Sequence, residues 1–220
     1  MKIGNPYLRP QFTQSVELAY RLKWEAGSFF LAGYYKQIED PYMRVYTADT
    51  TNETYDVIVK TYANTGGAKN VGLELVFSQQ ILDAWKLSAS ANYYQNRIEA
   101  YEGSLLFPYP HAFVIASSSE NTWDAKLSNT FQLGDHLEAQ LTAVYFAPKN
   151  IPQGRQLSRS SIDVGITQKL FDGRGELSFS ASDILNNFGI RQEIQGEGFA
   201  ADYENYYETQ VFRLGLKYKF

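Results

Sequence analysis

The chain has 220 residues, a formal net charge of -4 and a sequence pI near 5.3, a balance that argues against nucleic acid as a partner. It contains no cysteine, which excludes a disulfide framework and a thiolate metal site. No run of about eighteen apolar residues occurs, so a membrane-spanning helix is excluded as well.

Period-two alternation of apolar and polar residues predicts nine β-strands. In the first of them Val16, Leu18 and Tyr20 share one face, and Glu17 and Arg21 lie on the other. The nine predicted strands are residues 13–24, 28–38, 70–80, 85–98, 122–133, 137–147, 160–171, 176–185 and 211–220.

The last predicted strand has the most regular pattern. One face carries Phe212, Leu214, Leu216, Tyr218 and Phe220. A soluble edge strand with such a face would recruit partners and aggregate, whereas a strand that faces lipid needs it. The alternative at this point is the terminal strand of a soluble sandwich.

The connections between the predicted strands alternate in length. Short turns at 25–27, 82–84, 134–136 and 172–175 alternate with long connections at 39–69, 99–120, 148–158 and 186–206, of which the first includes a candidate hairpin extension at 55–63. All long connections therefore lie at one end, as in outer-membrane barrels with short periplasmic turns and long extracellular loops. The strands also approach the roughly nine to eleven residues that span a bilayer, which disfavours the sandwich.

These patterns predict an all-β fold, the antiparallel wall of a transmembrane β-barrel with about nine long strands in an up-and-down meander. An aromatic content of 15% with a mean hydropathy of -0.36 suits a barrel whose alternate residues face water. Strands 13–24 and 211–220 should be the two edges. Five side chains are expected on the convex, lipid-facing side: Leu127, Leu141, Val164, Phe179 and Leu216.

The strand count predicts that the wall is incomplete. Bacterial barrels have an even number of strands, with both chain ends on the periplasmic side of the outer membrane. If Phe220 lies on that side, nine strands place residues 1–12 on the outer surface of the cell. The first residues also lack an apolar leader segment. Both observations lead us to expect a chain that starts partway through a barrel.

Three short motifs and the chain end resemble one family. Residues 5–11, Asn-Pro-Tyr-Leu-Arg-Pro-Gln, are similar to the Asn-Pro-x-Leu-x-Pro-Glu segment of TonB-dependent outer-membrane receptors, with Gln11 where the family usually has Glu. Residues 62–74, YANTGGAKNVGLE, resemble a later strand entry of that family, and Asp183-Ile184-Leu185-Asn186 resembles the segment before its last extracellular loop. The motifs and the terminal Phe follow the family order, particularly that of the Bacteroidetes-type barrels.

The resemblance implies a function and a set of partners. Residues 1–220 would form the C-terminal part of a receptor barrel in the bacterial outer membrane, without its plug and earlier strands. Such receptors import siderophore-iron, vitamin cofactors or oligosaccharides with energy relayed by TonB, so a fragment alone should not transport. Implied partners are outer-membrane lipid, the remaining strands and plug, TonB through the plug, and the barrel-assembly machinery, which would read Phe212, Leu214, Leu216, Tyr218 and Phe220 as its signal.

Ligand-contacting residues are sought among aromatic side chains of the long connections, although packing between loops and an interfacial aromatic belt explain such residues at least as well. The candidates are Tyr101, Phe107, Tyr109, Tyr203, Tyr206 and Tyr207. The acidic residues Asp202, Glu204 and Glu208 could hold Ca²⁺, but without EF-hand spacing a solvated face is the better interpretation. No cofactor and no metal site are assigned.

Two other functions remain as alternatives. An outer-membrane enzyme would need a proton-transfer residue beside a nucleophile or second carboxylate, and the two histidines, His111 and His136, are predicted at opposite ends of the wall. A passive porin or scaffold barrel would differ only in the part of the protein that precedes this wall.

Overall fold

The computed structural model describes residues 2–49, 57–107 and 110–220. In this part of the chain no helix is long and apolar enough to cross a membrane. Nine strands form one large sheet, which we call the wall: β1 (Phe12–Trp24), β2 (Gly27–Glu39), β5 (Ala68–Leu82), β6 (Trp85–Ile98), β9 (Ser118–Leu133), β10 (Leu137–Phe146), β13 (Arg159–Leu170), β14 (Gly175–Ser182) and β17 (Val211–Tyr218).

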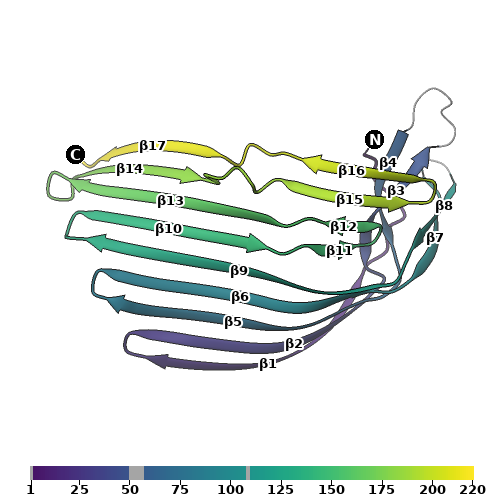
Figure 1. The fold of residues 1–220 in the computed structure, drawn as a ribbon, viewed down its shortest axis with the longest axis horizontal. Helices are drawn as coiled ribbons and strands as arrows, with labels where there is room; N and C mark the ends of the chain where they lie inside the picture. Colours follow the sequence, from purple (N-terminus) through teal and green to yellow (C-terminus); the bar gives the residue numbers. More distant parts are fainter. Residues whose placement is uncertain (1, 50–56, 108–109) are drawn as a thin grey trace.

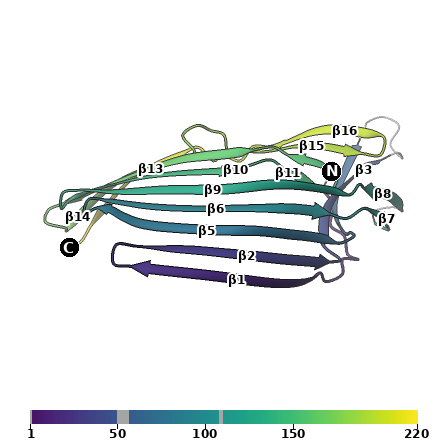
Figure 2. The same ribbon diagram turned by 60° about the horizontal axis from the view of Figure 1, so that its bottom comes forward.

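Every neighbouring pair in the wall is antiparallel, and the spatial order follows the chain order from β1 to β17. The sheet is curved, open and without crossovers (Figures 1 and 2). β1 and β17 are its two edges and do not pair with each other. The expected fold class, an antiparallel meander of nine strands in a partial barrel, is confirmed, as are the two edge strands.

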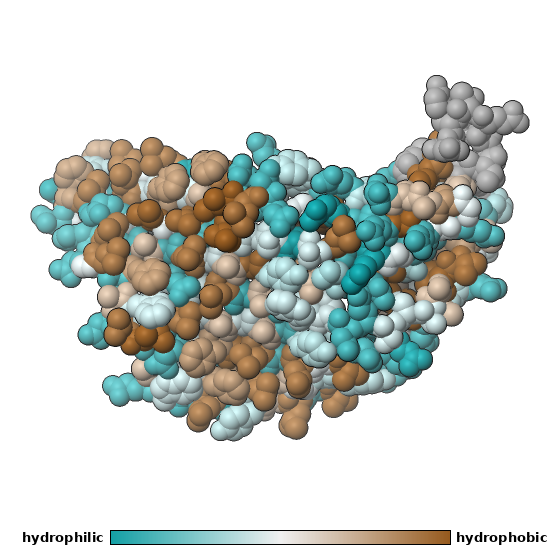
Figure 3. Space-filling view, in the orientation of Figure 1, coloured by the Kyte–Doolittle hydropathy of each residue, from teal (hydrophilic) through white to brown (hydrophobic). Residues whose placement is uncertain are grey.

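The two faces of the wall carry different side chains. On the outer face, four of the five residues expected toward lipid are exposed, Leu127, Leu141, Phe179 and Leu216, and the fifth, Val164, is partly buried. None of the five belongs to the buried core. In Figure 3 hydrophobic residues gather over the wall, toward the left of the view. An apolar surface of this kind suits contact with lipid rather than water.

The inner face carries small hydroxyl side chains in register across the wall. A single row of paired positions runs Ser28, Ser78, Ser88, Ser128, Thr142 and Asp163 over β2, β5, β6, β9, β10 and β13. Hydroxyl groups of adjacent strands lie 3.3 Å apart between Ser78 and Ser88, and 3.0 Å apart between Ser128 and Thr142. The inner face is therefore polar along this row.

The long connections contain more strands than the one hairpin extension that the sequence indicated. They form a second set of strands at one end of the wall, which we call the cap: β3 (Tyr42–Asp49), β4 (Val57–Asn64), β7 (Tyr101–Leu105), β8 (His111–Ile115), β11 (Lys149–Ile151), β12 (Gly154–Gln156), β15 (Ile190–Gly196) and β16 (Phe199–Asn205). β3 and β4 form one hairpin, β7 and β8 a second, and the other four strands a small sheet. The predicted hairpin extension at 55–63 corresponds to β4, and residues 55 and 56 lie outside the described residues.

Strand ends differ from the predicted ones for local reasons. β14 ends at Ser182 rather than at residue 185, because Asp183 has a φ of +46° and leaves the strand conformation. β17 ends at Tyr218, two residues before the predicted end. β9 starts at Ser118, earlier than predicted, because its first residues pair with the top of β6.

Candidate functional site

The cap has an enclosed apolar core that joins two of its hairpins to the wall. This core consists of Val45, Ala63, Ile98, Leu105, Phe113 and Ile115. Ile98 is the last residue of wall strand β6 and lies on its inner-face side, so this core contacts the inner-face side of the wall where β6 ends. In Figure 1 the cap strands gather at the right-hand end of the wall.

One glutamine connects the small four-stranded sheet to the first hairpin. Gln153, in the turn between β11 and β12, accepts a hydrogen bond from the Tyr46 backbone N–H at 2.7 Å and donates one to the Tyr46 carbonyl at 2.9 Å. The Tyr46 hydroxyl donates to Gln192 Oε1 at 3.2 Å. All three residues are buried, and burial raises the pKa of the Tyr46 phenol. These contacts fix the relative positions of loops from distant parts of the sequence.

A pocket of about 290 Å³ lies where these cap elements meet. Its lining includes Tyr46, His111, Gln153, Glu197 and Phe199, which come from four separate cap segments. Ligand pockets commonly measure about 300–1,000 Å³, so this one can hold a small group or one part of a larger ligand.

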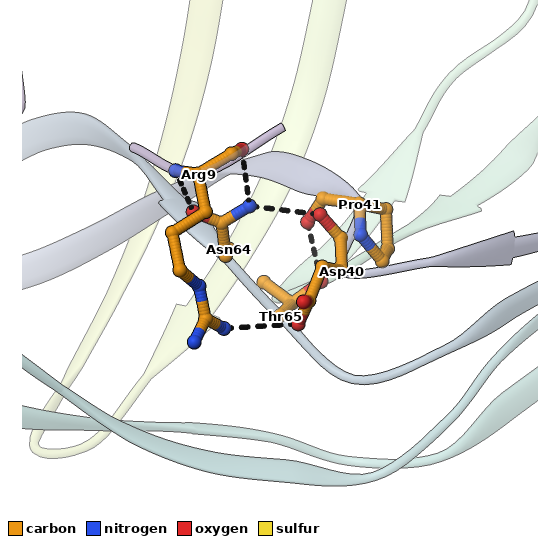
Figure 4. Close-up of polar contacts among 5 residues, drawn as sticks. All are labelled: Arg9, Asp40, Pro41, Asn64 and Thr65. Carbon is orange, nitrogen blue, oxygen red and sulfur yellow. Dashed lines mark hydrogen bonds and ion pairs between the residues drawn. The ribbon is translucent and has the colours of Figure 1, made fainter. Parts of the chain in front are cut away.

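Two of the family-like motifs meet at the base of the cap (Figure 4). The Asn64 side chain accepts a hydrogen bond from the Arg9 N–H at 2.7 Å and donates to the carbonyls of Arg9 at 2.9 Å and Asp40 at 2.8 Å. The Arg9 guanidinium pairs with the Asp40 carboxylate at 3.0 Å. Thr65 binds the Pro41 carbonyl through both its N–H and its hydroxyl. The residues before β1 are thereby attached to the β3–β4 hairpin.

The third motif is organised by one buried carboxylate. Asp183 accepts hydrogen bonds from the backbone N–H groups of Asn187 at 3.0 Å and Phe188 at 3.1 Å, and from the Thr209 hydroxyl at 2.6 Å. Its own N–H donates to Asp163 at 2.8 Å. Asp183 therefore holds together the two ends of the last long connection.

The residues proposed as an assembly signal are all on the surface. Phe212, Leu214, Leu216, Tyr218 and Phe220 are exposed, and the Tyr218 ring contacts those of Phe171 and Phe220 edge to face at centroid distances of 5.9 and 5.2 Å. Four of them lie on β17 and Phe220 follows it, and the outer edge of β17 has no partner strand among the described residues. This position is compatible with recognition by another protein, and that role stays a prediction.

The candidate loop aromatics that the structure describes make separate contacts. Tyr101 packs on the apolar core of the cap, with its ring 5.9 Å from that of Phe113, and the Lys60 Nζ lies 3.9 Å from the Tyr203 ring. Tyr206 donates to Asn186 at 2.6 Å, and Tyr207 accepts from Asn205 at 2.6 Å. Phe107 is exposed, and Tyr109 lies outside the described residues. The contacts of Tyr101 and Tyr203 are loop packing, and ligand contact by this set stays a prediction.

Ionisable groups suited to catalysis or metal binding are not brought together among the residues that the structure describes. His111 starts β8 in the cap, and His136 lies in the turn between β9 and β10 at the opposite end of the wall (Figure 1). Asp202 and Glu204 on β16 are exposed, as is Glu208, and no group of three potential metal ligands occurs in this part of the chain.

Sequence reasoning missed Gln153 and Arg159. A glutamine in a predicted loop gives no local signal of burial, and Arg159 falls between the predicted connection 148–158 and the predicted strand 160–171. In the structure Arg159 begins β13, with its guanidinium carbon 4.7 Å from the ring centroids of both Phe146 and Phe188.

The fold, with an apolar outer face, a polar inner face and a cap at one end, is that of an outer-membrane β-barrel wall. The model of the outer membrane protein β-barrel family matches residues 1–218, and the chain belongs to that family. It is therefore a protein of the bacterial outer membrane. A comparison with curated proteins found no match.

Solved structures of transporters and receptors share this fold. The copper transporter OprC is 15% identical with a TM-score of 0.63, over 98% of this chain and 32% of that one. The ferric enterobactin receptor PfeA from Pseudomonas aeruginosa is 13% identical with a TM-score of 0.57, over 96% and 31%. The FrpB iron transporter from Neisseria meningitidis is 16% identical with a TM-score of 0.53, over 99% and 33%.

The chain thus spans about a third of the length of the structures that it matches. The expected membership of an outer-membrane β-barrel family is confirmed, and the structural neighbours carry the names of transporters and a receptor rather than of enzymes.

Proposed function

We propose that residues 1–220 form the C-terminal part of the barrel of a TonB-dependent receptor that imports a scarce ligand, such as siderophore-iron, a vitamin cofactor or an oligosaccharide. The observation that carries the proposal is the ordered cap. All four long connections lie at one end of the wall, where two of them form the apolar core with the end of β6 and segments of all four line one pocket. A pocket assembled from four separate connections suits the binding of a ligand, which a passive pore does not require.

The edge strands and the inner face of the wall each suggest a partner. Strands β1 and β17 are unpaired edges, which earlier strands of the same receptor would join to close the barrel. The inner face, with its row of hydroxyl groups, would face a plug whose far side contacts TonB. The plug and the remaining strands are needed for transport, so this part alone should bind lipid but move no ligand.

Uptake by cells that express the full-length protein tests the proposal. Cells with and without TonB would be supplied with candidate iron chelates, vitamins and oligosaccharides, each radiolabelled, at concentrations below those at which diffusion suffices. We expect uptake of one ligand class that disappears without TonB. Uptake that persists without TonB would instead identify a passive porin, and conversion of the ligand by the purified protein would identify an enzyme.

A further inference from the structure

A groove of about 450 Å³ lies on the outer face of the wall over β9, β10 and β13, which are neighbours in the sheet (Figure 1). Its lining is predominantly apolar. Alanines on this face leave room between larger neighbours. Ala143 lies between Leu127 and Ile162 in one row of paired positions, and Ala125 lies beside Tyr145 in the next row.

Ordered side chains bound the groove at two places. Toward the cap, the rings of Trp123 and Tyr145 pack on each other with their centroids 4.7 Å apart. Leu185, from the connection after β14, also lines the groove. It is held beside β13 because the neighbouring Ile184 N–H donates to the Ile162 carbonyl at 2.9 Å. The groove is thus built by two separate parts of the chain.

Aromatic pairs on the outer face indicate the depth of the groove in the membrane. Trp85 and Phe131 stack at 5.9 Å near the turn end of the wall, whereas Trp123 and Tyr145 lie toward the cap. Outer-membrane barrels carry aromatic girdles at both interfaces of an apolar band about 25 Å tall. Phe131 and Trp123 are eight residues apart on β9, which corresponds to about 20 Å across a bilayer for a strand tilted by about 40°. The cap-side pair lines the groove and the turn-side pair does not, so the groove opens in the cap-side half of the band.

A cation lies just beyond the cap-side aromatic pair. Ser160 pairs with Tyr145 across the β10–β13 ladder and lines the groove. Its hydroxyl accepts a hydrogen bond from the Asn187 side chain at 3.0 Å, and Asn187 Oδ1 accepts one from the Arg191 guanidinium at 3.5 Å. Arg191 is therefore two hydrogen bonds away from the groove, on the side where lipid headgroups would lie.

The charge of Arg191 is not neutralised by the described part of the chain. The side chain is exposed, and its acceptors, the Ser158 carbonyl and Asn187 Oδ1, are neutral. Glu204 is opposite Arg191 in the β15–β16 ladder, but no ion pair among the described residues includes Arg191. A guanidinium with free N–H groups matches the oxygens of a phosphate.

We propose that the groove binds one acyl chain of a phosphorylated lipid of the outer leaflet, with the lipid phosphate at Arg191. The chain belongs to an outer-membrane family, so acyl chains are the apolar groups available at this depth. A chain in the groove gains contacts that a flat apolar face does not offer. Long connections lie outside the cell in such barrels, which places the cap-side half of the band in the outer leaflet. The inference goes beyond the proposed function, because it concerns the outer face and not the path of an imported ligand.

Photo-crosslinking of the full-length protein in phosphatidylcholine nanodiscs tests the inference. The two probes are phosphatidic acid and diacylglycerol, each with a diazirine in one acyl chain, and they differ only in the phosphate. Mass spectrometry would count crosslinks at groove residues relative to those at Leu214 and Leu216, which represent ordinary contact of the outer face with lipid. We expect phosphatidic acid to label the groove up to about fivefold more than diacylglycerol, as an exposed ion pair allows.

Two pairs of variants separate the acyl chain from the phosphate. Ala143→Leu fills the groove and should lower labelling by both probes about fourfold, the value of one displaced CH₂ group, and Ala125→Leu should act in the same way. Ala139→Leu is the matched control, since Ala139 is on the same strand and face but outside the groove. Arg191→Gln should reduce labelling by phosphatidic acid to that of diacylglycerol, whereas Arg174→Gln, an exposed arginine in the turn before β14, should not. All of these changes are at the surface, so insertion should be unaffected.

Three results would overturn the inference. Equal labelling of the groove in the unaltered protein, Ala143→Leu and Ala125→Leu would mean that it is ordinary lipid-contacting surface. Equal labelling by the two probes in the unaltered protein would reject a phosphorylated lipid. No lipid labelling of the groove, together with a dimer in native mass spectrometry that Ala143→Leu dissociates, would mean that a second copy of the protein occupies it. Uptake of ligand is measured separately, so none of these results bears on the proposed function.

Discussion

Apolar side chains are exposed on the outer face of the wall but buried in the cap. In the wall, Leu214 and Leu216 are 75% and 74% exposed, whereas in the cap Val45 and Ile115 are 0% and 1% exposed. Both sets belong to β-strands with period-two alternation. The cap buries its apolar side chains within the protein, whereas the wall leaves those of its outer face exposed, as expected of a face that contacts lipid.

The two regions should therefore respond differently to the same kind of change. In the wall, we expect stability to depend on lipid and on the ladder of backbone hydrogen bonds between neighbouring strands. In the cap, it depends on one small core and a few buried polar contacts. The variants below test whether the stability of the wall and that of the cap depend on different interactions.

The largest effect is expected at the end of the chain. Deletion of Phe220 from the full-length protein should prevent most insertion, because the assembly machinery is proposed to read this edge. If Phe220 merely faces lipid, its loss costs only about 1.5–3 kcal/mol of local burial, which a complete barrel tolerates. Quantification in purified outer membranes measures the outcome.

Leu141→Ala is the control for that deletion, since Leu141 is also exposed on the outer face but belongs to an interior strand. Equal amounts of both variants in the outer membrane would show that the last strand is ordinary wall and not a signal.

Within the cap, Ile115→Ala should destabilise the region by about 2–5 kcal/mol through the lost burial and the cavity left behind. Hydrogen exchange should then increase in β3, β4, β7 and β8 while β5, β6 and β9 keep their protection. The neighbouring Val114 is 48% exposed, so Val114→Ala should change little. Equal loss of protection in the wall would mean that cap and wall unfold as one unit.

A lysine introduced into each region tests whether the surface there faces lipid or water. Leu141 is 41% exposed on the wall and Val114 is 48% exposed on the cap. Leu141→Lys should cost about 2–4 kcal/mol because it places an ammonium against lipid, and Val114→Lys should cost close to nothing. Urea unfolding in lipid vesicles gives both values, and similar costs would contradict the assignment of the outer face to lipid.

The smallest effect is expected at the contact between the hairpin and the small sheet. Gln153→Ala leaves the buried N–H and carbonyl of Tyr46 without partners, at a cost of about 1–3 kcal/mol. Exchange of the Tyr46 amide should rise in this variant and remain slow in Gln195→Ala, a change at an exposed residue of β15. Unchanged exchange in both would show that other contacts hold the cap.

Much of the wall could be predicted because each strand carries its own signal. The face of Leu137, Leu141 and Tyr145, for example, follows from alternation within one segment. The order of the strands follows from the short turns, since a turn such as that at 134–136 permits only antiparallel neighbours. Of the cap strands, the sequence indicated only the hairpin extension at 55–63, because strands such as β11 and β12 have three residues each, too few to show a period.

The sequence alone therefore determined the class of fold, the apolar outer side and the two edge strands, because these depend on local periodicity and on turns between neighbours. The tertiary structure decided which loops meet. The contact of Gln153 with Tyr46 joins residues 107 positions apart, and the position of Arg159 depends on a ring from the connection after β14. No local pattern records such contacts, since they arise only when the curved wall brings its long connections to the same end.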